Sequence, residues 1–213
     1  MIVPREDFCF SDDWSDWVLE ENVIDINCRE LIDNMSDMAH FITVHGVPPT
    51  YFKNIFEGHK LTQIMHGQNT DESEYDQGGE MVSEATYYGP AYMMCTMTNE
   101  GFGRKHRSLQ LVSHVPLDLD HFLLRHGVMV EKIQEASEEE NQAIVDQYTV
   151  MTQMAFKQDV DIWHNKIRID NPLLCDGDGP LHLLREWYLQ FYLDAAEVPE
   201  KLKKRSEWNW EGN

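Results

Sequence analysis

Two long segments of the chain repeat their apolar residues at helical intervals. Between Asn27 and about Phe41, apolar residues recur at spacings of four, three and four, at Leu31, Met35, Met38 and Ile42. This spacing predicts one face of an amphipathic helix. The segment from about Ser137 to Asn165 contains neither Gly nor Pro and opens with three acids at 138–140, which suit a helix N-terminus. The pattern therefore predicts a second, longer helix there.

Shorter segments rich in β-forming residues lie between the two predicted helices, at 61–65, 84–88, 92–97, 108–115 and 122–130. Turn-like residues separate them, and parallel strands would need longer crossovers, so antiparallel pairing is expected. Residues 67–79 carry four acids and no aliphatic side chain. They are interpreted as a surface loop, with a lid over a pocket as the alternative. A sheet followed by a long helix predicts an α+β fold.

The length of 213 residues suits one large domain with its own core. Residues 1–20, which include the acidic and aromatic W14-S-D-W17, are interpreted as a lead-in to a main domain at 21–200. Pro180, which follows D176-G-D-G179, is expected to start a last helix. Residues 201–213 are expected to form a solvated tail.

The charge balance narrows the range of partners. With 17 Lys and Arg against 38 Asp and Glu, the formal net charge is −21, so a phosphate backbone or an anionic bilayer would be repelled. Neither nucleic acid nor a membrane is therefore an expected partner. The chain has no hydrophobic run long enough for a signal peptide or a membrane span, and no CxxC pair. A soluble cytoplasmic protein is expected.

The stretch N34-M-S-D-M-A-H-F-I-T-V-H-G46 places an amide, an acid and two imidazoles in an otherwise apolar, Met-rich run. A second anomaly is Asp159, because it falls on the apolar stripe of the long predicted helix. A buried carboxylate costs free energy unless it is paired, hydrogen-bonded or bound to a metal. Two imidazoles and one carboxylate are the ligand set of many mononuclear non-haem iron(II) sites. His40, His45 and Asp159 therefore form a candidate triad.

Helix geometry constrains this triad. Residues five apart lie about 140° apart around a helix, so His40 and His45 require the helix to bend or end between them. The following G46-V-P-P49 favours an ending. Asp37, three residues before His40, is placed to accept a hydrogen bond from its non-ligating ring nitrogen. The alternative is that both residues are ordinary capping or core histidines.

Several longer motifs carry a resemblance that covers the chain from W14-S-D-W17 to Asp194: N34-M-S-D-M-A-H-F-I-T-V-H45, P49-T-Y-F-K-N-I-F-E-G-H59, G127-V-M-V-E-K132, Q158-D-V-D-I-W163, K166-I-R-I-D-N-P-L-L174 and D178-G-P-L-H-L-L-R-E-W-Y-L-Q-F-Y-L-D194. Together they resemble the catalytic domain of the oxygenase component of 3-ketosteroid 9α-hydroxylases, which are Rieske non-haem iron oxygenases. The resemblance implies a helix-grip domain, in which a curved antiparallel sheet wraps around a long helix.

The resemblance also implies roles for the residues of the opening stretch. Mononuclear Fe(2+) would be bound by His40, His45 and Asp159. Asp37 would lie on the electron path between the Rieske cluster of one subunit and the iron of its neighbour in a ring-shaped trimer, with Asn34 near the iron. The implied reaction is the hydroxylation of a steroid ring carbon with O2.

The chain departs from the family in one respect. The family's Rieske domain holds a [2Fe-2S] cluster through C-x-H and C-x-x-H pairs, whereas no His follows Cys9, Cys28, Cys95 or Cys175 at those spacings. No [2Fe-2S] cluster is expected on this chain, so a Rieske-bearing oxygenase subunit and a ferredoxin reductase are expected to act in trans. Two alternatives are a non-catalytic steroid-binding or scaffold subunit and a redox-neutral steroid hydratase or lyase.

The substrate pocket is expected to be large and apolar. Inward positions of the predicted strands would supply its lining from Met65, Tyr88, Met93, Met97, Leu111 and Val128. Such a lining suits a rigid fused-ring ligand.

Overall fold

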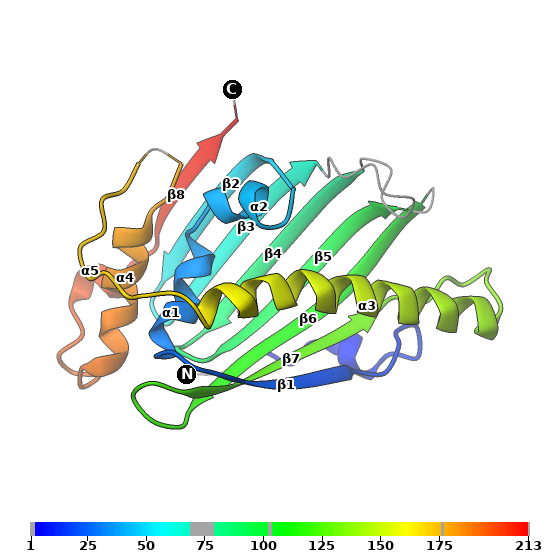
Figure 1. The fold of residues 1–213 in the computed structure, drawn as a ribbon, viewed down its shortest axis with the longest axis horizontal. Coiled ribbons are helices and arrows are strands. Elements are labelled where there is room, and N and C mark those ends of the chain that lie inside the picture. The colour runs from blue at the N-terminus through cyan, green and yellow to red at the C-terminus, as the bar shows by residue number, and fades with distance from the viewer. Residues whose placement is uncertain (1–2, 69–78, 102–103, 176, 213) are drawn as a thin grey trace.

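The computed structural model describes residues 3–68, 79–101, 104–175 and 177–212. Within them, a strongly curved antiparallel sheet of eight strands has the order β1-β7-β6-β5-β4-β3-β2-β8 (Figure 1). Its strands are β1 Val18–Ile24, β2 Pro49–Glu57, β3 Lys60–Gln68, β4 Glu80–Tyr88, β5 Tyr92–Gly101, β6 Arg104–Pro116, β7 Phe122–Val130 and β8 Ser206–Glu211. The strands from β2 to β7 follow chain order, so each pairs with its neighbour in sequence.

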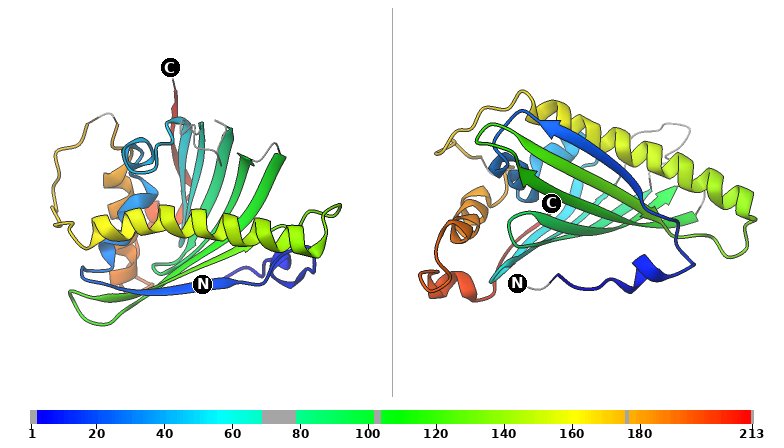
Figure 2. Two further views of the ribbon diagram at one scale, coloured as in Figure 1. Left: turned by 45° about the vertical axis from the view of Figure 1, so that its right-hand side comes forward. Right: turned by 90° about the horizontal axis from the view of Figure 1, so that it is seen from below.

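Most helices lie on the concave face or at one end of this sheet, whereas the short η1 (Asp7–Phe10) packs on the convex face (Figure 2). The long helix α3 (Glu138–Trp163) crosses the concave face, as the two further views in Figure 2 show. The remaining helical elements are η1 Asp7–Phe10, α1 Arg29–Ile32, η2 Asp33–Met35, α2 Ala39–Thr43, α4 Leu181–Leu189, η3 Gln190–Tyr192 and α5 Glu200–Lys203. None of the helices in the described residues is long and apolar enough to cross a membrane. The α+β character, with a large antiparallel sheet and a long helix, is confirmed.

All five strands predicted from the sequence are present, as β3 to β7. The structure adds β1, β2 and β8. Strand β8 differs from the expected solvated tail because Trp208 and Trp210 alternate with polar residues at the two-residue period of a strand, and both pack against the cluster around Phe52. Of the expected lid at 67–79, residues 69–78 lie outside the described residues.

The long helix begins where its sequence indicates. Ser137 is the N-cap, and its hydroxyl accepts a hydrogen bond from the backbone N–H of Glu140, while the Glu140 carboxylate accepts one from the backbone N–H of Ser137. This capping box satisfies backbone donors that a helix start otherwise leaves free. Helix α3 then buries Val145 and Tyr148 against Val128 and Val130 of β7, which fixes its position across the sheet.

The helix predicted from Asn27 to Phe41 is broken into α1, η2 and α2. The physical reason lies at Met35, whose carbonyl accepts hydrogen bonds from the side chains of Asn54 (2.7 Å) and Gln63 (3.0 Å). Those strand side chains replace the backbone donor that would have continued the helix. The break also rotates the apolar stripe, so that Ile42, expected to be buried with Met35, is 52% exposed.

Candidate metal centre

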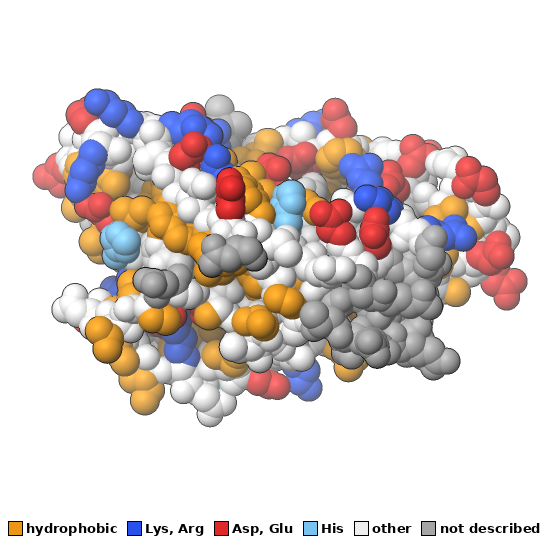
Figure 3. All heavy atoms as spheres, turned by 90° about the horizontal axis from the view of Figure 1, so that it is seen from above, with side chains coloured by type: hydrophobic (Ala, Val, Ile, Leu, Met, Phe, Trp, Pro, Cys, Tyr) orange, Lys and Arg blue, Asp and Glu red, His pale blue; other side chains and the backbone are white. Residues whose placement is uncertain are grey.

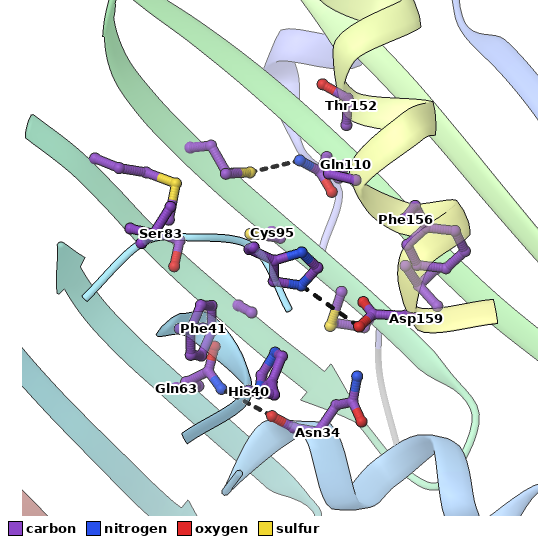
Figure 4. A pocket seen from close by; sticks show the side chains of 18 of the residues that line it. Asn34, His40, Phe41, Gln63, Ser83, Cys95, Gln110, Thr152, Phe156 and Asp159 are labelled. Atoms are coloured by element: carbon purple, nitrogen blue, oxygen red, sulfur yellow. Dashed lines mark hydrogen bonds and ion pairs between the residues drawn. The ribbon is translucent and has the colours of Figure 1, made fainter. Parts of the chain in front are cut away.

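Two segments that are far apart in sequence converge at one end of helix α3. His40 lies in α2, His45 lies in the turn after it, and Asp159 lies in α3, with Asn34 and Gln63 close by (Figure 4). One ligand atom from each of His40, His45 and Asp159 lies within 4.8 Å of the others. The helix ends between the two histidines, as their spacing required, because α2 stops at Thr43.

His45 is held from both sides of its ring. Its Nε2 lies 3.4 Å from Oδ1 of Asp159, and its Nδ1–H donates to Oε1 of Gln158 at 3.1 Å. Burial alone lowers the pKa of His45, but the hydrogen bond and the negative charge of Asp159, together with Gln158, outweigh it and raise the pKa above its usual value. Because Gln158 engages Nδ1, Nε2 is the ring nitrogen that faces the centre and offers a lone pair there once it loses its proton.

His40 is oriented by the backbone rather than by a side chain. Its Nδ1–H donates to the backbone carbonyl of Asp37, whereas the Asp37 carboxylate accepts the backbone N–H of His40 at 3.2 Å. The expected partner residue is therefore present, but the Asp37 side chain does not accept from the ring. Burial lowers the pKa of His40 despite the charges of Asp159 and Asp37. A neutral His40 with Nδ1 occupied presents Nε2 as a lone-pair donor.

The electrostatics of this cluster favour a cation. The side chain of Asp159 is only 13% exposed, and its one ion-pairing partner among the described residues is His45. No Lys or Arg among the described residues forms an ion pair with Asp159. Two ring nitrogens and a desolvated carboxylate that face each other without a cationic side chain match the donor set of a mononuclear metal site.

A largely apolar cavity of about 290 Å³ opens from the cluster. Helix α3 lines one wall with residues spaced by three and four: Tyr148, Met151, Thr152, Ala155, Phe156, Asp159 and Trp163. Strands β3 to β6 line the opposite wall, and Figure 4 shows Ser83, Cys95 and Gln110 projecting from them toward α3. Tyr148 and Asp159 are eleven residues apart, so the cavity follows the helix for roughly 16 Å.

The lining expected from sequence is correct for Met93 and Met97 and wrong for the other four residues. Tyr88 and Leu111 pack on the convex face of the sheet beneath the N-terminal segment. Successive strand residues point to opposite faces, so an error of one residue exchanges the two faces, and Tyr87 and Val112 line the cavity instead.

The other two residues expected in the lining, Met65 and Val128, lie beside the cavity and not in its wall. Met65 packs with Met38, Val47 and Phe52 below α2. Val128 is covered by Val145 and Tyr148 of α3. Both residues belong to the core beside the cavity.

A second, smaller cavity of about 230 Å³ reaches the same cluster from another side. Its lining includes Asp37 and Asp178, and it shares four residues with the larger cavity: Asn34, His40, Asp159 and Trp163. Asp37, singled out by the sequence, therefore faces the smaller cavity, whereas Asn34 touches both. The cluster therefore separates a largely apolar chamber from a smaller one with a mixed polar and apolar lining.

One residue of the centre was not found by sequence reasoning. Gln158 immediately precedes Asp159 and supports His45, although alone it looks like an ordinary polar helix residue. On one face of the molecule, acidic and basic side chains occur together (Figure 3). Figure 3 shows Asp and Glu spread over the upper face among Lys and Arg, with hydrophobic side chains exposed toward its middle.

Comparison with known proteins places this geometry in context. Residues 1–192 match the family described as the 3-ketosteroid 9alpha-hydroxylase C-terminal domain. The chain is 40% identical over 213 residues to a 3-ketosteroid-9-alpha-monooxygenase oxygenase component of Rhodococcus rhodochrous, covering 98% of this chain and 54% of that protein. It is 40% identical over 212 residues to the protein of that name from Mycobacterium tuberculosis, with coverages of 96% and 54%. The chain thus spans about half the length of these curated relatives.

Solved structures share the fold at much lower identity. The QL mutant of NdmA from Pseudomonas putida CBB5, solved with theobromine, has a TM-score of 0.63 at 11% identity and covers 95% of this chain and 57% of its own. Dicamba monooxygenase bound to 3,6 dichlorosalicylic acid has a TM-score of 0.57 at 13% identity, with coverages of 89% and 62%. These structures support the fold of the chain.

Proposed function

Because the chain belongs to the 3-ketosteroid 9alpha-hydroxylase C-terminal domain family, we propose that it is the iron-bearing catalytic part of a steroid ring hydroxylase with a helix-grip fold. The observation that carries this proposal is the position of His40, His45 and Asp159 at one end of an apolar cavity. A metal centre that opens into an apolar chamber brings a reactive group to a substrate from which water is largely excluded.

The residues at the centre fit Fe(2+). His40 and His45 would bind it through Nε2, because backbone and Gln158 oxygens engage their Nδ1 atoms, and Asp159 would supply a carboxylate oxygen. Fe(2+) held there would supply the redox chemistry by which one oxygen atom of O2 enters a C–H bond and the other leaves as water, with two electrons and two protons consumed. Asp159 would offset part of the metal's positive charge, and the oxygen acceptors at Nδ1 would strengthen both imidazoles as donors.

The larger cavity would hold the steroid. Its methionines and aromatic rings provide a broad, adaptable apolar surface for a rigid fused-ring molecule. Among the lining residues, Asn34, Gln63 and Ser83 are polar and lie on the side of the cavity near His40 (Figure 4). They would orient the ring carbon that reacts.

The smaller cavity would be the side from which electrons arrive. Asp37 lies there beside His40, and we assign it to the electron path from a Rieske [2Fe-2S] centre carried by a partner oxygenase subunit. A ferredoxin reductase would supply electrons to that subunit. The working assembly would be a homo- or hetero-trimer in the cytoplasm.

Reconstitution tests this function. The chain is combined with a Rieske-bearing oxygenase subunit of the same family, its reductase, NADH, a 3-ketosteroid and O2, and the hydroxylated product is measured by mass spectrometry. Product formation should be abolished by Asp159→Ala and reduced by at least about 100-fold by Asp37→Ala. Unchanged product with Asp159→Ala would instead make this chain a non-catalytic subunit. Product formation without reductant and O2 would indicate a redox-neutral enzyme.

A further inference from the structure

A group of five charged side chains, two buried acids and three partly exposed cations, lies beside the metal centre. Its acids are Glu30 of α1, with no exposed surface, and Asp33 of η2, which is 5% exposed. Its cations are Lys166 and Arg168, from the segment after α3, and Arg185 of α4. We call these five residues the charge cluster.

The contacts within the charge cluster are short and specific. Arg185 grips Asp33 with a two-pronged contact, Nη2 to Oδ2 at 2.8 Å and Nε to Oδ1 at 3.2 Å. Lys166 Nζ bridges Asp33 Oδ2 at 3.0 Å and Glu30 Oε2 at 3.1 Å, the latter an ion pair without hydrogen-bond geometry. Arg168 Nη1 donates to Glu30 Oε1 at 2.7 Å. A bidentate guanidinium fixes the angle of a carboxylate as well as its distance.

The chain between Asp33 and Asp37 is also held from two other sides. Asn54 and Gln63 donate to the carbonyl of Met35, as described above. Across from them, the backbone of Gly179 approaches the carbonyl of Ser36 so closely that an added Cβ would lie 2.1 Å from that oxygen. This stretch therefore has little freedom, although it forms no regular α-helix that would hold it by its own hydrogen bonds.

The charge cluster joins the two halves of the candidate centre. Asp33 directly precedes Asn34 and lies seven residues before His40, while Lys166 lies seven residues after Asp159. The Lys166–Asp33 ion pair thus ties the segment that carries His40 to the end of the helix that carries Asp159. Arg185 adds a second tie, because its Nη1 also donates to the backbone carbonyl of Ile169 at 2.7 Å.

From these contacts, and resting on the proposed function, we infer that Arg185 and Lys166 are positioning residues. Through Asp33, they fix His40 relative to Asp159 and so set the geometry in which the metal is bound. Replacing a buried ion pair by well-packed apolar residues is often neutral or even stabilising, whereas a two-pronged guanidinium contact fixes the orientation of its carboxylate. A lysine at position 185 would keep the charge but lose the fork, so orientation and charge are separable by experiment.

The test compares Arg185→Lys and Lys166→Met with Leu109→Ala. Leu109 lies on the convex face of the sheet with Trp14, Met94 and Met129, so shortening it removes core packing away from the centre. Each variant is loaded anaerobically with Fe(2+) for affinity measurement and with Co(2+) for EPR, and its stability is measured by urea unfolding. We expect Arg185→Lys to weaken Fe(2+) binding about 10-fold, in the range seen for outer partners of metal ligands, and to broaden the Co(2+) spectrum.

Leu109→Ala is expected to lower stability at least as much as Arg185→Lys while leaving the affinity and the spectrum unchanged. Equal Fe(2+) affinity and identical spectra in wild type, Arg185→Lys and Lys166→Met would overturn the inference, as would the same loss of affinity in Leu109→Ala. A wild-type chain that binds no Fe(2+) would instead overturn the proposed function. The two failures are therefore distinguishable.

Discussion

Two neighbouring groups of charged and polar side chains contain buried carboxylates, and they differ in the basic side chains that face those carboxylates. In the charge cluster, two carboxylates face three cationic side chains, and both carboxylates are paired with two of them. In the candidate metal centre, one carboxylate faces two imidazoles, and Asp159 has no Lys or Arg partner among the described residues.

This difference separates a structural group from a binding group. A carboxylate already surrounded by Lys and Arg has no remaining attraction for a metal ion, whereas a desolvated carboxylate beside two lone-pair donors gains most from a divalent cation. Burial of acids alone therefore does not identify a metal site. The type of basic partner does: permanent cations in the first group, and imidazoles with oriented lone pairs in the second.

The largest expected effect comes from breaking the charge cluster. Glu30→Ala should lower the free energy of unfolding by about 3 kcal/mol, because it leaves Arg168 without its buried acid and removes one of the two buried acids that pair with Lys166. The value lies at the low end of the range for buried pairs because both cations are partly exposed and can be rehydrated. Urea unfolding measures this loss. Glu21→Ala serves as the control, because Glu21 is exposed and its replacement is expected to change the free energy of unfolding by less than about 0.5 kcal/mol. Equal losses of stability in the two variants would contradict a structural role for the charge cluster.

A smaller effect is expected from the residue that supports His45. Gln158→Leu removes the acceptor for the Nδ1–H of His45 and should weaken Fe(2+) binding 10- to 100-fold, by roughly 1.4 to 2.7 kcal/mol. Gln153→Leu makes the same chemical change on the same helix and serves as control. Competition against a chelator gives both affinities, and a similar loss in Gln153→Leu would refute the assigned support.

Histidines outside the centre should respond to acid. His114 is buried against Phe122, and burial lowers its pKa from 6.5 to about 4. Between those values the unfolded chain binds more protons than the folded chain, so stability falls as pH decreases below 6.5. His114 should thus make the protein about 1 kcal/mol less stable at pH 5.5 than at pH 8. His114→Leu should remove this part of the pH dependence. Urea unfolding of both proteins at the two pH values measures it, and an equal loss of stability from pH 8 to pH 5.5 in wild type and His114→Leu would contradict the role of His114.

The smallest effect is expected from Asp159 in the metal-free protein. Asp159→Asn loses the ion pair with His45 but also removes a desolvated charge, so the two changes oppose each other. The free energy of unfolding without metal should change by less than about 1 kcal/mol. A loss as large as that in Glu30→Ala would mean that the centre is as structural as the charge cluster.

The sequence indicates the triad because anomalies are visible at single positions. Asp159 stands out against its apolar neighbours, and His40 and His45 stand out in a Met-rich run. The five central strands were also predictable, because their residues are β-forming and bounded by turns. Each of these signals is local.

The remaining features depend on contacts between distant segments. The break after Met35 comes from Asn54 and Gln63, which no helical pattern reveals. The cavity lining depends on strand register, where a shift of one residue exchanged Tyr87 for Tyr88. Glu30 and Asp33 look like ordinary surface acids until residues more than a hundred positions later pair with them.

We propose that His40, His45 and Asp159 form a mononuclear iron site. The most direct measurement is the iron content of the chain after anaerobic loading with Fe(2+) and gel filtration, for wild type, His40→Ala and Asp159→Ala, with folding verified by circular dichroism. We expect about one iron per wild-type chain and at least about 100-fold weaker binding in both folded variants. Equal iron content in all three proteins, or none in the wild type, would contradict it.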